Sequence, residues 1–418
     1  MTQRYDTYKD SGVQWLGEIP GHWECVRLNK LAYLKTGSTP KFFENKLFDE
    51  TIDWYTPSDF NEDFSLGKAR RRLNRKDFED CGLNYIPANS VLLIGIGATA
   101  GKVSCNTREC YSNQQITSII PNNRMISFYM MLYLRSIRNI ILKTAHYTTL
   151  PILNNLFLAG ISLPLPPLSE QRSIVSFLDT KCGKIDEWVT KKQKEVEHLQ
   201  ELKQRVIADA VTRGLNPHVK MKTTNIPWLK EIPEHWEIKR SKYLLKLLTE
   251  STKRTRKIGL ENIESNTGKF ILTETIFDGD GVDFDCGDIL YGKLRPYLNK
   301  VWLAEFDGNA VGDFYVYRAI NGYFNSFAKY LLMSSCFVGI SNASTYGAKM
   351  PRVSSQFIHS LHFPVPPLSE QKQIVSYLDA KCAKIDKLIA NITKEIERIK
   401  EYKQRLISDV VTGQIKVC

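Results

Sequence analysis

The sequence predicts an α/β protein of two mixed α/β domains separated by two long helices that pack as an antiparallel coiled coil, with a pseudo-two-fold internal repeat. Three observations predict this fold class. The 418 residues suit two to four domains, an internal repeat spans the chain, and each copy of the repeat carries a heptad pattern.

Two segments of the chain occur twice. Residues 164–182, PLPPLSEQRSIVSFLDTKC, return at 364–382 as PVPPLSEQKQIVSYLDAKC, with 14 of 19 positions identical. Residues 15–23, WLGEIPGHW, return at 228–236 as WLKEIPEHW, with seven of nine identical. The layout is variable segment, shared helix, variable segment, shared helix. The repeated segments follow one another in a circular order that is interrupted only between Cys418 and Met1. This order predicts a molecule with internal pseudo-two-fold symmetry.

The shared segments are typical of long helices. Pro-Pro-Leu-Ser predicts a helix start with a serine N-cap, a glutamate follows where the helix dipole favours a carboxylate, and a glycine stands past the far end. We expect a break in the first helix near Cys182 and Gly183. The serines, glutamates and glycines are Ser169, Ser369, Glu170, Glu370, Gly214 and Gly413.

Along each helix, mostly apolar residues recur at alternating spacings of four and three residues and form a seam. Sustained over about four heptads, this pattern indicates a coiled coil of some 26 residues, roughly 40 Å long. The alternative is that each helix is buried separately in its own domain, but neither helix has a broad third apolar face. The second seam is Ile385, Ile389, Ile392, Ile396, Ile399, Lys403, Leu406 and Val410, and the first is Ile185, Val189, Lys192, Val196, Leu199, Lys203, Val206 and Ala210.

The two variable segments, residues 1–168 and 215–368, carry most of the net charge of +12, at +4 each. An excess of basic side chains favours nucleic acid as a partner. Both segments alternate apolar runs with turn-rich stretches, which predicts mixed α/β domains. The expected strands lie in 90–96, 116–120, 288–291 and 314–318, and the expected helices in 127–142 and 324–337.

The candidate DNA-binding residues are two basic clusters and several polar or aromatic residues near expected loops. Lys and Arg neutralise phosphates, whereas Arg and Lys contacts to guanine and Asn and Gln contacts to adenine read sequence. For any one of them, an ordinary solvated surface residue is the competing interpretation. The candidates are Lys68, Arg70, Arg71, Arg72, Arg75, Lys76, Lys102, Asn113, Gln114 and Tyr147 in the first segment, and Lys253, Arg254, Arg256, Lys257, Lys293, Arg295, Tyr297, Tyr346, Lys349 and Arg352 in the second.

Signals of catalysis or metal binding are weak. Residues 95–100 match GxGxxA, but neither the amphipathic helix nor the acidic residue of a dinucleotide or S-adenosylmethionine site follows, so a glycine turn between strands is the better interpretation. The aspartates between 278 and 288 lack the spacing of a calcium loop and predict an acidic surface turn. We expect no catalytic residue and no metal site.

The cysteines and the distribution of apolar residues indicate the cellular compartment in which the protein is expected. Nine scattered cysteines without a CxxC pair indicate a reducing environment. No stretch approaches 18 apolar residues and the N-terminus lacks an apolar segment. We therefore expect a cytoplasmic protein without a membrane partner.

Taken together, the repeated P-[LV]-P-P-L-S-E-Q, the I-V-S-[FY]-L-D that follows it and the WLxEIPxHW elements resemble the specificity subunit of type I restriction-modification enzymes. The resemblance spans the whole chain and the order of its parts. It implies a first target recognition domain at 1–163, a conserved helical region at 164–214, a second recognition domain at 215–363 and a second helical region at 364–418.

The resemblance also implies a function. Each recognition domain would bind one half of a bipartite double-stranded DNA site, and the helices would dock two methyltransferase subunits, with restriction/translocase subunits joining them. S-adenosylmethionine, ATP and magnesium would be used by those partners, so this chain would bind no cofactor. Helices that separate two readers by about one DNA turn, 34 Å, would set the spacer, and segments of different length predict an asymmetric site.

Two other classes stay open at this point. A stand-alone transcription regulator or nuclease-like DNA binder would show a recognisable helix-turn-helix and would not co-purify with a methyltransferase. A self-sufficient methyltransferase would bind S-adenosylmethionine at the GxGxxA loop, which calorimetry on the isolated chain would detect.

Overall fold

The protein folds into two compact units, one made of residues 1–191 and 395–418 and the other of residues 192–394. The computed structural model describes residues 3–39, 51–61, 65–74, 83–144, 151–251, 254–347 and 349–417. Both boundaries between the units fall inside the long helices α5 (Leu168–Arg213) and α9 (Leu368–Val411). Each unit therefore combines one variable segment with part of each helix, while the four-segment division of the sequence stays a prediction.

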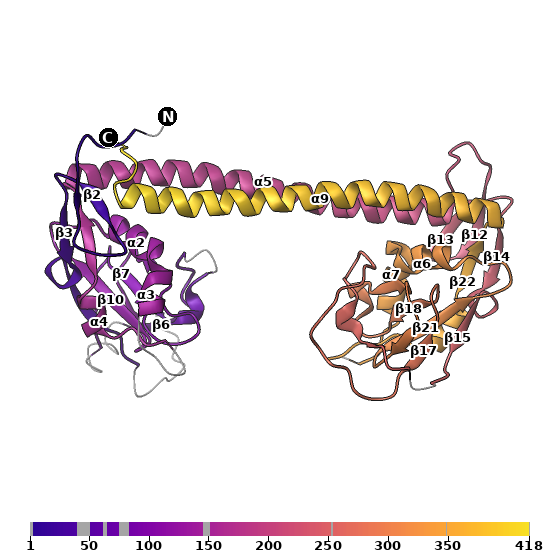
Figure 1. Ribbon diagram of the computed structural model, residues 1–418. Helices are drawn as coiled ribbons and strands as arrows, with labels where there is room; N and C mark the ends of the chain where they lie inside the picture. The colour runs from indigo at the N-terminus through magenta and orange to yellow at the C-terminus, as the bar shows by residue number, and fades with distance from the viewer. Residues whose placement is uncertain are drawn as a thin grey trace. The chain divides into compact units, whose positions relative to one another are not determined.

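The first unit is built on a four-stranded antiparallel sheet of order β4-β10-β7-β8, with α2 packed on β7 and β8 (Figure 1). All four residues of β7 are buried, as its apolar run predicts. A second sheet has the order β6-β5-β9. The elements are β1 (Tyr8–Asp10), β2 (Glu18–Pro20), β3 (Glu24–Arg27), β4 (Ala32–Thr36), β5 (Thr51–Tyr55), β6 (Arg71–Asn74), β7 (Val91–Ile94), β8 (Val103–Cys105), β9 (Cys110–Ser112), β10 (Ile116–Pro121), α2 (Ser127–Ser136), α3 (Arg138–Thr144), α4 (Asn155–Ala159) and β11 (Ser162–Leu165).

The second unit repeats this topology. Its main sheet has the order β15-β21-β18-β19, which matches β4-β10-β7-β8 strand for strand, and α6 packs on β18, β19 and β21. A further sheet has the order β16-β20-β17. The elements are β12 (Met221–Ile226), β13 (Leu229–Pro233), β14 (Glu237–Arg240), β15 (Leu245–Leu248), β16 (Lys257–Ile258), β17 (Val282–Phe284), β18 (Ile289–Gly292), β19 (Val301–Leu303), β20 (Gly308–Ala310), β21 (Phe314–Ala319), α6 (Asn325–Met333), α7 (Ser335–Ala343), α8 (Ser355–Ser360) and β22 (His362–Val365).

The prediction of two mixed α/β domains and a long helix is confirmed, with two corrections. Helix α5 runs without a break through Cys182 and Gly183, because a single glycine costs a helix only about 1 kcal/mol. The helices begin at Leu168 and Leu368, so the following serines lie in the first turn and are not N-caps. The glycines past the far ends have the left-handed φ of a C-terminal stop, as expected.

The start of each long helix carries the residues Ser-Glu-Gln, at 169–171 and 369–371, which we call the SEQ motif. The glutamate of this motif contacts the adjacent histidine and tryptophan of the WLxEIPxHW element in its own unit. Glu170 accepts a hydrogen bond from Trp23 Nε1 at 2.9 Å and contacts His22 Nε2 at 2.5 Å. Glu370 accepts one from Trp236 Nε1 at 3.0 Å and contacts the preceding histidine at 2.8 Å. Both indoles are almost fully buried, so each N–H depends on this carboxylate.

The glutamine of the motif is equally specific. Gln171 and Gln371 are buried, and each donates to the carbonyl of the proline five residues earlier at 2.9 Å. Their Oε1 atoms accept backbone N–H bonds of 2.8 Å from the residues before helices α2 and α6. The SEQ motif is thus a set of side chains that ties each long helix to its domain.

Within each unit, α5 and α9 are joined by one ion pair at a seam lysine. Lys403 Nζ lies 2.7 Å from Asp186 in the first unit, and Lys203 Nζ lies 2.7 Å from Asp386 in the second. The side chain of Lys203 is only 7% exposed. Two of the three seam lysines therefore pair with an aspartate of the other helix, and the third, Lys192, lies 2.8 Å from Glu195 of its own helix. Packing as one coiled coil along the whole helices stays a prediction.

The two ends of the described chain meet in the first unit. Lys416 N donates to Gln3 O at 2.8 Å, and Tyr8 Oη donates to Gly413 O at 2.9 Å. These contacts fit the order of a ring that the repeats predicted.

We expect the change Glu370→Ala to destabilise the second unit by about 1–3 kcal/mol, because it leaves the buried Trp236 N–H without an acceptor. Urea unfolding followed by circular dichroism measures the loss. Glu397→Ala, at an exposed position of α9, is the matched control and should leave the midpoint unchanged. Equal effects of the two substitutions would contradict this role of Glu370.

Candidate nucleic-acid interface

Each domain presents a hairpin loop directly after a buried central strand. The loop 95–102 joins β7 to β8, and the loop 293–300 joins β18 to β19. Gly95 N bonds Gln115 O at 2.7 Å, and Lys293 N bonds Asp313 O at 2.9 Å. The loops are therefore equivalent at an offset of 198 residues, and the glycine turn expected at 95–100 is confirmed.

A third segment borders each loop. Gly97 N bonds Pro151 O at 3.4 Å, and Arg295 N bonds Pro351 O at 2.8 Å. We call the three adjoining segments the loop platform. It comprises residues 95–102, 113–115 and 151–153 in the first unit, and residues 293–300, 311–313 and 346–353, apart from 348, in the second.

The second loop platform brings together six residues that the sequence nominated from two separate stretches. The bridges Leu294–Arg352 and Tyr346–Arg352 join these stretches. The exposed side chains include Tyr297 at 50% and Tyr346 at 59%, as a surface that stacks on or contacts a ligand requires. The six residues are Lys293, Arg295, Tyr297, Tyr346, Lys349 and Arg352.

Asp313 organises the basic side chains of this platform. It accepts hydrogen bonds from Arg352 Nε at 3.0 Å and from Nη2 at 2.9 Å, and Lys293 Nζ lies 3.9 Å away. The bonds to Asp313 raise the pKa of the Arg352 guanidinium. Two of the six candidates are thus held in fixed positions, with Arg352 still 33% exposed.

Arg295 stands in an unusual backbone conformation at the tip of the loop. Its φ of 50° and ψ of 65° lie in the left-handed region, which costs a residue with a Cβ roughly 1–3 kcal/mol. Pro296 follows, and proline disfavours helical conformations in the residue before it. The side chain is exposed, and no group among the described residues accepts a hydrogen bond from it.

The first loop platform has a different chemistry on the same backbone plan. Gly97, with a φ of 105°, stands at the position that Arg295 occupies in the second platform. Two apolar side chains of this platform, Ile96 and Ile152, are exposed to solvent. Of the nominated residues, Gln114 is exposed and accepts a hydrogen bond from Thr39, while Lys102 Nζ donates to a backbone carbonyl at 3.2 Å. Asn113 is buried and bonds to Gln115 at 2.9 Å.

The basic cluster of the second domain lies elsewhere and is engaged within the fold. Arg254 binds Asp285 at 2.7 Å, Arg256 lies 3.2 Å from the centroid of the Phe306 ring, and Lys257 donates to a carbonyl at 2.9 Å. Lys253 lies outside the described residues. These contacts stabilise the sheet β16-β20-β17.

The basic cluster of the first domain is more exposed. Arg72 pairs with Asp53 at 2.8 Å, and Arg71 lies 5.8 Å from the centre of the Trp54 ring. Lys68 and Arg70 are exposed, the latter with its guanidinium 3.9 Å from Asp59. The remaining candidates Arg75, Lys76 and Tyr147 lie outside the described residues.

The expectation of an acidic surface turn between 278 and 288 is wrong for part of the segment. Asp288 is 1% exposed and, with Asp285, binds Arg318 at 2.7 Å. Hydrogen bonds from Arg254 and Arg318 lower the pKa of Asp285. Asp288 is buried because the guanidinium of Arg318 in β21 compensates its charge, whereas Asp285 stays 47% exposed.

Sequence reasoning missed Gln115 and Asp313, the residues against which the loops close. Each directly precedes an expected strand, β10 or β21. Superposing the two halves on those strands would have paired them.

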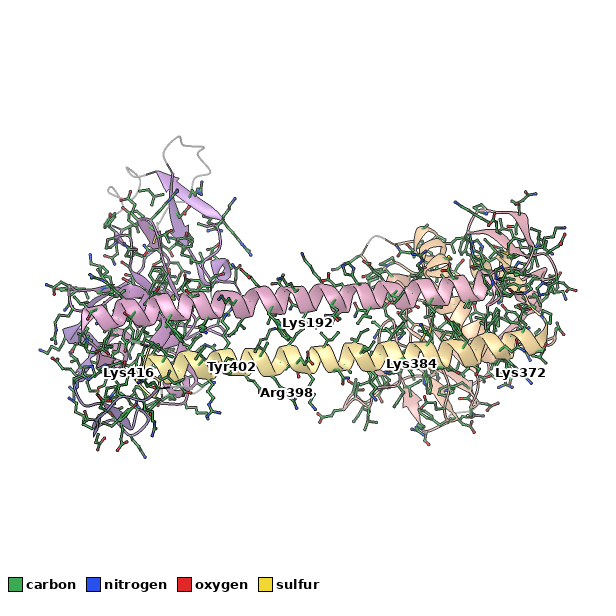
Figure 2. All side chains as sticks on the ribbon, turned by 90° about the horizontal axis from the view of Figure 1, so that it is seen from above. Lys192, Lys372, Lys384, Arg398, Tyr402 and Lys416 are labelled. Atoms are coloured by element: carbon green, nitrogen blue, oxygen red, sulfur yellow. The ribbon has the colours of Figure 1, made fainter. Side chains whose placement is uncertain are left out.

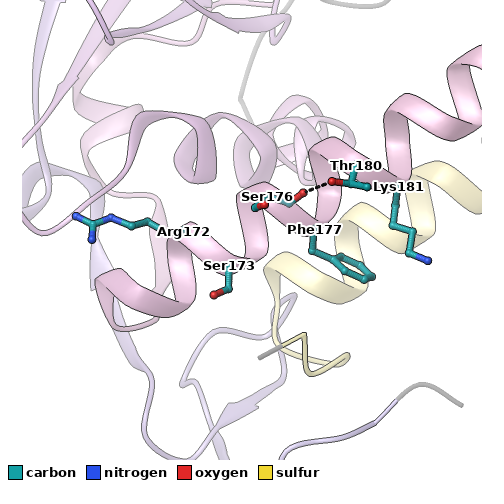
Figure 3. A pocket seen from close by; sticks show the side chains of 6 residues that line it. All are labelled: Arg172, Ser173, Ser176, Phe177, Thr180 and Lys181. Carbon is teal, nitrogen blue, oxygen red and sulfur yellow. Dashed lines mark hydrogen bonds between the residues drawn. The ribbon is translucent and has the colours of Figure 1, made fainter.

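A second kind of repeated surface lies on the long helices. Figure 3 shows a pocket on α5 lined by Arg172, Ser173, Ser176, Phe177, Thr180 and Lys181. The matching positions of α9 keep a basic residue at 372 and 381 and an aromatic, Tyr377, which is 42% exposed. Among the described residues, no group of three or more His, Cys, Asp and Glu side chains could hold a metal ion.

A groove in the first unit continues this surface along the helices. It is lined by Ile185 and Trp188 of α5 and by Ile399, Tyr402 and Leu406 of α9 (Figure 2 labels Tyr402). The positions that match Trp188 and Tyr402 are Leu388 and Leu202, which are 51% and 45% exposed. Large apolar side chains are thus exposed at equivalent places in both copies. Among the described residues, no helix is long and apolar enough to cross a membrane.

The family model of the type I restriction modification DNA specificity domain matches residues 20–198 and 233–398, which is most of the chain. The chain belongs to this family. The type I restriction enzyme MjaVIII specificity subunit of Methanocaldococcus jannaschii is 24% identical over 428 residues, covering 96% of this chain and 94% of that protein. The EcoDI specificity subunit of Escherichia coli is 24% identical over 425 residues, covering 96% and 90%.

Solved structures support the fold of this specificity-domain protein. A chain from a study of complex assembly in the type I R-M system superposes with a TM-score of 0.72 at 14% identity, covering 94% of this chain and 98% of that one. The HsdS subunit from Thermoanaerobacter tengcongensis superposes with a TM-score of 0.52, also at 14% identity, covering 95% and 98%.

Proposed function

We propose that this chain is the non-catalytic DNA-recognition subunit of a type I restriction-modification complex. The observation that carries the proposal is the pair of loop platforms, which share one backbone plan but carry different side chains. Each platform would read one half of a bipartite site in double-stranded DNA. The nominated residues of the second platform are basic or aromatic, and such side chains bind phosphates, stack on bases or read guanine.

The repeated surfaces on the long helices suggest which proteins bind this chain and in how many copies. Two equivalent surfaces of the same chemistry suit two copies of one partner, and the family indicates a methyltransferase subunit. The exposed aliphatic and aromatic residues would be buried on docking, with the flanking lysines and arginines at the rim. Restriction/translocase subunits would join this assembly in the cytoplasm, and the partners would use S-adenosylmethionine, ATP and magnesium.

The long helices would set the spacer between the half-sites. Helix α5 connects β11 of one domain to β12 of the other, so its number of residues bears on the separation of the two platforms. The two ion pairs at Lys203 and Lys403 would keep α5 and α9 in one register.

We expect the recognised sequence to be asymmetric, because the exposed side chains of the two platforms differ. Single-molecule sequencing of host DNA for modified adenines, with and without the gene for this chain, returns both half-sites and the spacer. A palindromic site would contradict two different readers, and modification that is independent of this chain would contradict the proposed function.

Lengthening both helices by one heptad should lengthen the spacer and leave the half-sites unchanged. Seven residues add about 10.5 Å, which corresponds to roughly three base pairs. The insertions belong between Asp186 and Lys203 in α5 and between Asp386 and Lys403 in α9, so that both ion pairs are kept. Methylation mapping reads the result. A four-residue insertion in α5 alone, which shifts the seam, is the control and should abolish modification, while an unchanged spacer in the heptad variant would rule out the helices as the ruler.

The double change Leu202→Glu and Tyr402→Glu should abolish co-purification of the methyltransferase, because it places a charge at each of the two apolar surfaces. Either single change should leave one copy bound, which native mass spectrometry of the complex measures. Lys400→Glu is the control, since it lies on the opposite flank of the seam, and it should leave both copies bound. Full assembly of the double variant would refute docking at this surface.

A further inference from the structure

The loop tips of the two domains have the same backbone plan but differ at one residue. Gly97 and Arg295 occupy equivalent positions: each N–H bonds the carbonyl of a proline, Pro151 or Pro351, and each carbonyl accepts the N–H three residues later. Both residues have positive φ, 105° and 50°. Glycine adopts this conformation freely, whereas arginine does not.

The fold itself therefore gives no reason for an arginine at this position. The first domain closes the same loop with a glycine, and Pro296 makes the left-handed conformation of Arg295 less favourable still. The guanidinium contacts no acceptor among the described residues, so it returns no stabilisation to the loop. A strained residue held by its surroundings, with a free side chain, is typical of a functional site.

The surroundings of Arg295 favour a directed contact. Its own N–H is pinned to Pro351, and its carbonyl accepts a hydrogen bond of 2.9 Å from Leu298 N, so the backbone at this residue is fixed on both sides. The neighbouring basic groups of Lys293 and Arg352 are drawn to Asp313. A guanidinium on a fixed backbone presents its donor fork in a restricted set of directions, which suits recognition of one planar edge more than a general attraction for phosphate.

We infer that Arg295 determines specificity in the second half-site by donating two hydrogen bonds to the O6 and N7 atoms of a guanine. This inference rests on the proposed function. Its chemistry is that of the bidentate arginine contact to the major-groove edge of guanine. Gly97 leaves the equivalent position of the first domain without a side chain, so the first half-site would be read without such a contact.

The test uses the complex reconstituted with its methyltransferase subunits and the site found by methylation mapping. Binding is measured by fluorescence anisotropy to the cognate duplex and to duplexes in which each base pair of both half-sites is changed in turn. Arg295→Gly should lose discrimination at one G·C pair of one half-site by roughly 5- to 150-fold. The other half-site should be read as before, and the midpoint of thermal unfolding should not fall, because glycine relieves the strained backbone.

Two further variants separate the explanations. Arg295→Lys keeps the charge but lacks the donor fork, so it should lose the same discrimination while retaining most of its affinity for non-cognate DNA. Arg240→Ala, an exposed arginine of the same domain outside the platform, should change neither quantity.

Three results would overturn the inference. A uniform loss of affinity across all duplexes, restored by lysine, would make Arg295 a phosphate contact. A lower unfolding midpoint for Arg295→Gly would make it a structural residue. Unchanged discrimination at every base pair would remove it from recognition. Absence of site-specific modification by the wild-type complex is a separate result, because it contradicts the proposed function whatever Arg295 does.

Discussion

The carboxylates of Glu170 and Glu370 connect the two repeated parts of the chain, the long helices and the Trp-His elements. Each stands in the first turn of a long helix and binds a buried indole N–H and an imidazole of its own unit. A carboxylate at a helix N-terminus is favoured by the helix dipole, so the same group stabilises the helix and orients it on the domain. Together with the bonds of Gln171 and Gln371, this contact ties each domain to the start of its helix.

The repeated SEQ motif and the variable loops perform different physical tasks. Glutamate and glutamine side chains of the motif satisfy buried donors and acceptors, and the loss of any one leaves an unpaired polar group in the core. The loop platforms end at the surface, where a side chain is constrained only by the backbone that carries it. A framework of this kind keeps the backbone plan constant while its exposed side chains change, as the exchange of Gly97 for Arg295 illustrates.

Much of the fold was predictable because the chain is written twice. The apolar runs at 90–96 and 314–318 predicted strands, and the heptads at 385–410 predicted a helix that the structure shows as α9. The serine caps and the break at Gly183 were wrong for local reasons. Both are decided by a balance of about 1 kcal/mol between neighbouring residues, which a sequence pattern does not resolve.

The candidate site was predictable in part. Sequence reasoning found the basic and aromatic residues at 293–297 and 346–352, but their proximity depends on backbone bonds across more than fifty residues. It also nominated Arg254, whose guanidinium is occupied by Asp285, since charge alone does not distinguish a residue that binds a ligand from one that balances a neighbour. Asp288 was expected at the surface for the same reason, although it is buried against Arg318. What separates the two roles is whether the fold already supplies a partner. On that criterion Arg295, which has a strained backbone and no hydrogen-bond acceptor within the described part of the chain, ranks above the clustered arginines.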